Sequence, residues 1–243
     1  MSEKMKMIKH KLGILYWDIR KKCNEIIYKS RKRVKSLNVF ILGFLVKKQI
    51  DYNKINKVKC LIICAHPDDE TIFFYSIIKK FKPYIICMSN RGNKTRRKEF
   101  ENALKHQGVD GVLLNFPDMI GFRWRWLEPL LISKLKNIKK NAHNLEGVYT
   151  HNNVGESGHH HHFDLSCAAR KVFKDKQIYL TSEYANEKDE VKDYADKEYI
   201  VKSIYKSQYK MLSMWCPWFK HYMKYEYFEK VKRDNDKHSS TDI

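Results

Sequence analysis

Leu61-Ile62-Ile63-Cys64-Ala65-His66-Pro67-Asp68-Asp69-Glu70-Thr71 is the stretch of sequence that decides the fold. A run of apolar and small residues leads directly into a histidine, a proline, three acids and a threonine. An apolar run that a proline ends is typical of a strand buried on both faces, as in a parallel sheet. The acids then stand at the carboxyl end of that strand, where open α/β sheets have their binding crevice.

The adjacent acids have two interpretations. Asp68 and Asp69, as neighbours, point in different directions, so one can face a metal while the other faces a substrate. Such acids also repel one another unless a cation or a helix N-terminus offsets their charge. The alternative is an acidic helix start, with Asp69 as the N-cap and with Glu70 and Thr71 as structural residues of the first turn.

Strands and helices alternate from Lys57 onward, which predicts βαβ units and a parallel sheet. The expected strands are 58–64, 83–88, 112–115, 147–150 and 177–181, and the expected helices are 71–81, 95–107, 127–140 and 163–173. Thr95 is the expected N-cap of the second helix, and Gly108 its C′ residue. The predicted fold class is α/β, a Rossmann-like three-layer α/β/α domain with a mostly parallel sheet.

Two extensions flank this domain in our division of the 243 residues. We expect a basic helical N-terminal extension at 1–56, the α/β domain with a helical C-terminal part at 57–231, and a disordered tail at 232–243. The charged segment 183–197 has the composition of a mobile loop over the site. The aromatic and basic segments 214–219 and 222–228 either pack as helices or contact sugars or a membrane surface.

The net charge of +20 is unevenly distributed, because residues 1–57 contain 16 Lys or Arg and 4 Asp or Glu, a local charge of +12. Such an arm favours a polyanionic partner, whether nucleic acid, an anionic membrane or a phosphorylated substrate. Its apolar patch Leu37–Val46 has about half the length of a membrane span. The patch is either a helix docked on the core or an interfacial segment on anionic lipid.

Six cysteines without a Cys-x-x-Cys pair, mostly in apolar surroundings, are typical of a reduced intracellular protein. The apolar patch is not N-terminal and no small-residue cleavage site follows it, so we do not expect a secretory signal. We expect a cytoplasmic location, with peripheral contact at the cytoplasmic membrane face.

Four consecutive histidines, His159 to His162, follow a predicted strand and precede a predicted helix, as His66 and its acids do. Two such strand ends in one parallel sheet converge on one crevice. His66, one of Asp68 or Asp69, and a second histidine would form the two-histidine, one-carboxylate set of a hydrolytic zinc site. An engineered tag or a solvated loop is the alternative, although tags are usually terminal.

These motifs resemble the LmbE-like zinc de-N-acetylases, whose eukaryotic, PIG-L branch acts on N-acetylglucosaminyl-phosphatidylinositol. His66-Pro67-Asp68-Asp69-Glu70 resembles the metal motif of the family, and Gly158-His159-x-x-His162 resembles its second motif. Arg96-x-x-Glu99 with Gly108-Val109 resembles a third, weaker block. The resemblance covers about Val58 to Thr181.

The resemblance implies zinc held by His66, Asp69 and His162, with Asp68 as general base and His159 beside the reacting carbonyl. The implied reaction removes the N-acetyl group from an N-acetylglucosamine-type sugar in a glycoconjugate and releases acetate. His160-His161 stand where many bacterial members have Pro-Asp, and Ser157 where some members have tyrosine.

Arg96 and Asp118 stand at strand ends around the predicted crevice and are candidates for binding sugar hydroxyls or a phosphate of the substrate. The alternative for Arg96 is an ordinary surface charge on a helix. The expected partner is an N-acetylated amino sugar, lipid-linked or phosphorylated, and nucleic acid is not expected.

Two other function classes compete with the deacetylase. A non-catalytic polyanion- or membrane-binding protein would use the same fold and the basic arm, but would not need the set of His66, Asp68, Asp69 and His162. A two-metal phosphoesterase would need more acidic ligands than Asp118 supplies, and histidines suit zinc better than magnesium.

Overall fold

The computed structural model describes residues 29–30, 32–34, 37–38, 40–41, 50–119, 121–216 and 218–231, without the side chains of residues 157 and 215. Most of the expected N-terminal extension, much of the apolar patch at 37–46, and the whole expected tail at 232–243 lie outside these residues.

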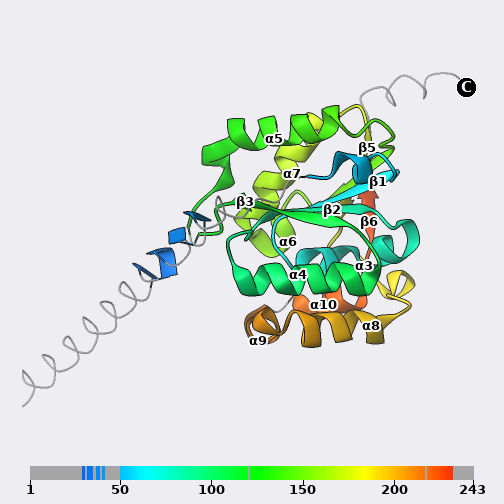
Figure 1. Cartoon of the computed structure of the whole chain (residues 1–243). Helices are drawn as coiled ribbons and strands as arrows, with labels where there is room; N and C mark the ends of the chain where they lie inside the picture. The colour runs from blue at the N-terminus through cyan, green and yellow to red at the C-terminus, as the bar shows by residue number, and fades with distance from the viewer. Residues whose placement is uncertain are drawn as a thin grey trace, which may run out of the picture.

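A six-stranded sheet runs through the centre of the domain, in the order β3-β2-β1-β4-β5-β6 (Figure 1). Strands β1 to β5 are mutually parallel, and β6 pairs with β5 in the antiparallel sense. The strands are β1 Cys60–Cys64, β2 Tyr84–Ser89, β3 Gly111–Phe116, β4 Gly147–Thr150, β5 Gln177–Thr181 and β6 Phe228–Lys230. The predicted α/β class with a mostly parallel sheet is confirmed.

Helices cover both faces of this sheet, because each central strand is apolar on both sides. Leu61 and Ile63 of β1 point to one face, into a core shared with α5 (Glu128–Lys140) and α7 (His160–Val172). Ile62 and Cys64 point to the other, into a core shared with α3 (Asp69–Phe81) and α4 (Lys94–Gln107). The three layers of the predicted architecture are therefore present (Figure 1).

The C-terminal helices add a further layer outside α3 and α4 (Figure 1). This layer contains α8 Tyr194–Tyr199, a π-helical turn at Ile200–Ile204, α9 Lys206–Trp215 and α10 Phe219–Lys224. Phe219, Tyr222 and Met223 are buried in the core of that side, so this part of the aromatic, basic segments packs as helix. Shorter pieces are α2 Tyr52–Ile55, α6 Gly155–Gly158 and two 3₁₀ turns, Trp124–Leu127 and Glu187–Asp189.

Two local expectations are wrong. Helix α4 is capped by Asn93, whose side chain accepts a hydrogen bond from the N–H of Arg96, and Thr95 lies inside the first turn. The segment 183–197, expected as a loop over the site, is not a loop throughout. It includes the start of α8, and its Asp193 and Asp196 both accept a hydrogen bond from the Tyr75 hydroxyl of α3.

Strand order explains where the functional site lies. The chain runs from β1 to β2 and β3 on one side, then returns to place β4 on the other side of β1. The carboxyl ends of β1 and β4 therefore flank the point where the order reverses, which is where doubly wound sheets bind their ligands.

Two further observations concern the helices and the cysteines of the described residues. None of the helices described is long and apolar enough to cross a membrane. The five cysteines of the described ranges, Cys60, Cys64, Cys87, Cys167 and Cys216, are free thiols, and the first three are buried.

Candidate metal centre and active site

Three ligand-type atoms meet at the carboxyl ends of β1 and β4. His66 Nδ1 lies 3.2 Å from His162 Nε2 and 3.4 Å from Asp69 Oδ2. His162 Nε2 lies 3.3 Å from the same oxygen of Asp69. All three side chains are buried, His66 being 7% exposed. The structure thus brings together the three residues that the sequence suggested as a metal set.

This triangle fits zinc. In a tetrahedral site with nitrogen and oxygen ligands about 2.0–2.2 Å from the metal, neighbouring ligand atoms lie about 3.3–3.5 Å apart. The three separations in the structure, 3.2, 3.3 and 3.4 Å, are close to this range. Three protein ligands from two imidazoles and one carboxylate also leave a fourth position open, as in catalytic zinc sites.

The two neighbouring aspartates point to different partners. Asp69 is the first residue of α3, and its Oδ2 accepts the backbone N–H of His66 at 2.8 Å while facing the imidazole nitrogens. The Asp68 carboxylate instead accepts a hydrogen bond from Arg96 Nη2 at 3.0 Å. Asp69 is thus not the N-cap of α3; Asp68 occupies that position, without a side-chain capping bond.

Asp68 is held in an unusual backbone conformation. Its φ of 107° is rare for a residue with a side chain, and such strain typically costs about 1–3 kcal/mol and gathers at functional sites. The N–H of Asp68 donates to Glu70 Oε2 at 3.0 Å, and the Tyr205 hydroxyl donates to Glu70 Oε1 at 2.6 Å. A buried carboxylate tied to α3 and to the C-terminal layer therefore fixes the strained residue.

Burial and Arg96 have opposite effects on Asp68. Burial raises the pKa of the Asp68 carboxyl well above its usual range, and the Arg96 guanidinium lowers it in part. Arg96 also donates to the Pro67 carbonyl, and its side chain is only 12% exposed. Arg96 is therefore a buried component of the site and not a surface charge on a helix.

Glu156 holds His162 in place. Its Oε2 accepts hydrogen bonds from Nδ1 of His162 at 2.7 Å and from Nδ1 of His151 at 3.0 Å. Its Oε1 accepts the Asn152 N–H at 3.0 Å and a hydrogen bond from the Thr181 hydroxyl. A ligand histidine that donates its other N–H to a carboxylate is fixed in tautomer and orientation, so His162 presents Nε2 to the metal position.

The turn before the histidines needs a glycine. Asn152 Oδ1 accepts the N–H groups of Val154, Gly155 and Glu156 at 2.7–3.1 Å, which folds the chain sharply after β4. Gly155 has a φ of 74°, and a Cβ at this position would lie 3.1 Å from the backbone nitrogen of Phe163. This tight turn brings Glu156 under the start of α7.

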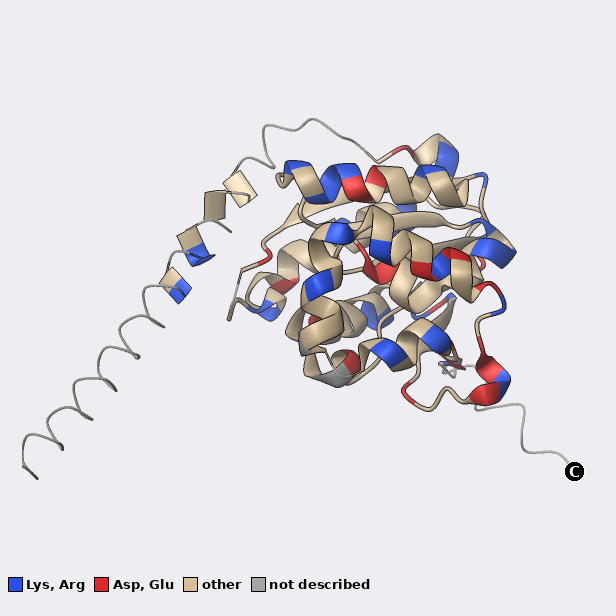
Figure 2. Cartoon of the chain, turned by 90° about the horizontal axis from the view of Figure 1, so that it is seen from below, with Lys and Arg blue, Asp and Glu red and all other residues tan. Residues whose placement is uncertain are grey.

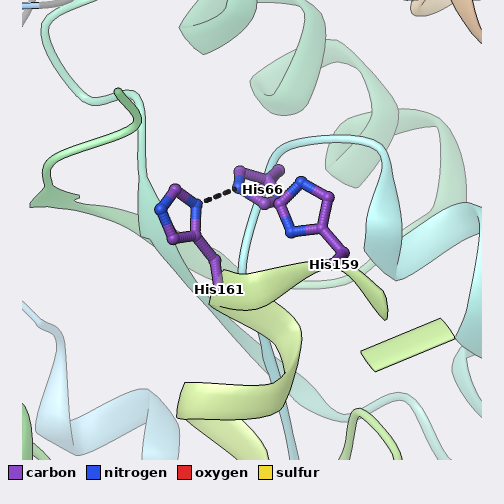
Figure 3. A group of neighbouring side chains, drawn as sticks. All are labelled: His66, His159 and His161. Carbon is purple, nitrogen blue, oxygen red and sulfur yellow. Dashed lines mark hydrogen bonds between the residues drawn. The ribbon is translucent and has the colours of Figure 1, made fainter. Parts of the chain in front are cut away.

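His159 lies at the mouth of the site. Its ring centroid is 4.7 Å from that of His66 and 4.3 Å from that of His162, and Figure 3 shows the side chain projecting towards His66. Solvent reaches the ring, but the surrounding protein removes part of its hydration. This desolvation and the neighbouring imidazoles lower the pKa of His159, so the neutral ring is favoured.

Asp118 borders the same site from the end of β3. Its Oδ1 lies 3.7 Å from His66 Nε2, and its Oδ2 accepts a hydrogen bond from Asn90 Nδ2 at 2.9 Å. One third of the side chain is exposed (33%). Burial opposes ionisation of Asp118, but His66, Arg96 and Asn90 lower its pKa, which keeps a charged acceptor beside the crevice.

Several site residues escaped the sequence reasoning. His151, Glu156 and Asn90 contact the predicted set, and Tyr205 contacts Glu70 beside it. His151 and Glu156 follow a predicted strand end, so the rule that selected His66 would have selected them. Tyr205 carried no such signal, because it reaches Glu70 only through the packing of the π-helical turn Ile200–Ile204 on α3, across 135 positions of sequence.

Known proteins resemble this chain over the part that contains the site. Residues 61–173 match the protein family described as PIG-L, GlcNAc-PI de-N-acetylase. A probable N-acetylglucosaminyl-phosphatidylinositol de-N-acetylase of Dictyostelium discoideum is 28% identical over 144 residues, which are 52% of this chain and 54% of that protein. Residues 61–173 are a PIG-L domain. The resemblance to this family that the motifs suggested is confirmed over residues 61–173.

A second relative of the PIG-L domain is also described as a de-N-acetylase. The N-acetylglucosaminyl-phosphatidylinositol de-N-acetylase of Saccharomyces cerevisiae is 27% identical over 180 residues, 63% of this chain and 59% of that protein. The chain thus spans little more than half the length of the curated relatives it matches.

Two solved structures share the fold of the PIG-L domain. The A40926 pseudoaglycone deacetylase Dbv21 superposes with a TM-score of 0.53 at 15% identity, covering 71% of this chain and 95% of that one. A zinc-inhibited form of the teicoplanin deacetylase Orf2 superposes with a TM-score of 0.50 at 17% identity, covering 63% and 86%.

Proposed function

We propose that this chain is a zinc-dependent hydrolase that removes the acetyl group from an N-acetylglucosamine-type sugar in a glycoconjugate. The observation that carries the proposal is the triangle of His66 Nδ1, Asp69 Oδ2 and His162 Nε2, with the Asp68 carboxylate next to it in the chain. The PIG-L domain and the relatives described as de-N-acetylases support the choice of an N-acetylated sugar.

His66, Asp69 and His162 would hold the zinc ion. When bound, zinc supplies Lewis acidity, which polarises an amide carbonyl and makes water more acidic. Neighbouring groups hold the ligand side chains in the orientation that this needs, since Glu156 orients His162 and the N–H of His66 orients Asp69.

Asp68 would take a proton from the attacking water and pass it to the leaving amine. Its burial raises the pKa, so this carboxylate holds a proton more readily than an exposed aspartate does. Arg96 fixes the carboxylate through Oδ2, and Glu70 fixes the backbone. The products are acetate and the free amino sugar.

His159 would stabilise the negative charge that develops on the acyl oxygen. The lowered pKa of His159 favours a neutral ring. A neutral imidazole still donates one N–H, and a donor held in place before the reaction is effective at such a position.

Asp118 and Arg96 are the proposed substrate contacts. Asp118 is the more accessible of the two and is suited to accept hydrogen bonds from sugar hydroxyls. Arg96 is largely engaged by Asp68 and the Pro67 carbonyl, so its contact with a substrate phosphate would be at the edge of the site.

The described part of the basic arm supports contact with an anionic membrane. Val34, Leu37 and Ile41 are 59%, 45% and 53% exposed and recur at helical spacing, and Lys and Arg lie on the same pieces of chain (Figure 2). Asn115 Nδ2 donates to the Phe40 carbonyl at 2.7 Å, so this segment lies beside β3, the strand that leads to Asp118. We propose peripheral attachment at the cytoplasmic membrane face, with a lipid-linked or phosphorylated substrate.

Acetate release tests the proposed activity. Full-length protein is assayed on N-acetylglucosaminyl-phosphatidylinositol and on soluble N-acetylglucosaminides with and without a phosphate. We expect release from at least one substrate, its loss on chelation and its return with zinc. Zinc-loaded protein that releases no acetate from the panel would refute the deacetylase and leave the polyanion-binding alternative, which the charge of the arm favours.

A further inference from the structure

His161 contacts the metal set although it lies outside it. Its Nδ1 is 3.0 Å from Nε2 of His66, as the dashed line in Figure 3 marks. The other ring nitrogen of His66, Nδ1, is the one beside Asp69 and His162. The Nε2 of His161 is 2.9 Å from the backbone carbonyl of Phe122. We propose that His161 is a positioning residue, which accepts the Nε2–H of His66 and thereby fixes the nitrogen that His66 offers to zinc. This inference rests on the proposed metal centre.

The hydrogen bonds assign each proton. A backbone carbonyl only accepts, so the Nε2 of His161 must carry the hydrogen that it donates to Phe122. A neutral His161 then has a lone pair on Nδ1, which accepts from His66 Nε2–H. His66 in turn has its lone pair on Nδ1, the atom that lies in the triangle with Asp69 and His162. The Phe122 carbonyl thus determines the tautomer of His161, and His161 in turn determines the tautomer of His66.

Packing holds the His161 ring in this orientation. The ring stacks on Trp124 at 4.6 Å between centroids and 9° between planes. Trp124 is fully buried, and its indole N–H donates to the Pro117 carbonyl at 2.8 Å. Arg123 binds Asp164 of α7 through two nitrogens, at 3.0 and 3.3 Å. The loop that carries the Phe122 carbonyl is therefore fastened to the helix that carries His161.

The neighbourhood favours a neutral acceptor. Metal-bound histidines commonly donate to a carboxylate, as His162 does to Glu156. Asp118 Oδ1, however, lies 3.8 Å from His161 Nδ1, and a second carboxylate at position 161 would face it at close range. An imidazole supplies the acceptor without adding negative charge. His66 therefore donates to a neutral acceptor, His161, whereas His162 donates to an anionic one, Glu156.

Three substitutions separate the hydrogen bond from the packing. His161→Phe keeps a ring against Trp124 but removes the acceptor. His161→Asn loses the ring, but its side-chain oxygen, two bonds from Cβ like Nδ1 of histidine, can still accept from His66. His160→Phe is the matched control, because His160 lies in the same turn and is exposed.

Zinc affinity of the metal-free proteins, measured by competition with a chelating indicator, gives the readout. We expect H161F to bind zinc about 10- to 100-fold more weakly than the wild type, H161N to recover much of this loss, and H160F to match the wild type. Equal affinity in H161F and wild type would overturn the inference, as would H161N binding as weakly as H161F. A second bound zinc lost only in H161F would make His161 a ligand and also overturn it.

A second measurement does not depend on the folding of the variants. Long-range ¹H–¹⁵N spectra of the zinc-loaded wild type should show His66 and His161 both protonated at Nε2. Protonation of His161 at Nδ1 would overturn the inference and leave the metal centre intact. A wild type that binds no zinc would instead refute the proposed function together with this inference.

Discussion

At the scale of single residues, the site depends on two adjacent carboxylates with different surroundings. Asp69 lies among imidazole nitrogens, whereas Asp68, turned away by a φ of 107°, meets Arg96. Because Asp68 has this strained conformation, its side chain and that of Asp69 point to different partners although the two residues are adjacent in sequence. Glu70 maintains this conformation by accepting the Asp68 N–H, and the Tyr205 hydroxyl in turn donates to Glu70.

Substitution of Asp68 tests this division. Asp68→Asn should retain zinc, because the residue is not a ligand, but should lower deacetylation by about 10²-fold or more, the usual size of general-base catalysis. Zinc content and acetate release are measured on the same sample. The matched variant Asp69→Asn should lose zinc. Loss of zinc from Asp68→Asn would show that the two aspartates have exchanged roles.

At the scale of elements, helix α3 connects the site to the C-terminal layer. Its first residues carry Asp69 and Glu70, and its middle carries Tyr75, which donates to Asp193 and Asp196 beside α8. The hydroxyl of Tyr205, just before α9, reaches back to Glu70. The C-terminal helices are thus part of the support of the active site.

Tyr205→Phe tests this support. The variant removes one hydrogen bond to a buried carboxylate, which should cost about 1.5–3 kcal/mol in free energy of unfolding, measured with denaturant. Acetate release should also fall while bound zinc remains, because Glu70 positions Asp68. The control is Tyr209→Phe in α9. Unchanged turnover in Tyr205→Phe would show that Glu70 holds Asp68 without it.

We expect Asp196 to make the docking of α8 depend on pH. Burial opposes ionisation, but hydrogen bonds from His106, Lys79 and Tyr75 lower the pKa of Asp196. The folded state then binds this proton less readily than the unfolded state, so the stabilisation is present above pH about 4 and is lost as the pH falls below it. The Tm difference between wild type and Asp196→Asn should therefore shrink on acidification. A difference that stays constant over this pH range would contradict the role of Asp196.

The sequence identified elements well where the signal is local. Two strands, Gly147–Thr150 and Gln177–Thr181, have the predicted bounds. Short apolar runs between polar segments are typical of buried strands, so the local pattern was sufficient. The strand-end rule also predicted that His66, one of Asp68 or Asp69, and a second histidine would meet, and the family resemblance narrowed this set to His66, Asp69 and His162. Composition was a poorer guide for the segment 183–197, whose charges suggested a loop. The Tyr75 hydroxyl that binds its aspartates lies 118 positions away from Asp193, so no local signal could show this contact.

At the scale of the whole molecule, the uneven charge is the basis of the proposed membrane attachment. The arm at 1–57 holds +12 of the net +20, and each basic residue near an anionic membrane contributes about 1 kcal/mol. The exposed Val34, Leu37 and Ile41 would add apolar contact at about 25 cal/mol per Å² buried. Together these terms favour reversible attachment near the crevice.

Vesicle flotation tests the attachment. Full-length protein should float with anionic vesicles at low salt, bind less at high salt because exposed charges are screened, and lose binding when residues 1–50 are deleted. Neutral vesicles are the control. A full-length protein that stays unbound at low salt would contradict the role of the arm and leave the active site untouched.

The central claim is that His66, Asp69 and His162 hold zinc, and anomalous diffraction at the zinc absorption edge tests it most directly. Crystals of the full chain with one equivalent of zinc should show one anomalous peak, bounded by His66 Nδ1, Asp69 Oδ2 and His162 Nε2. A peak among other residues, or no peak in protein that remains folded, would contradict the account.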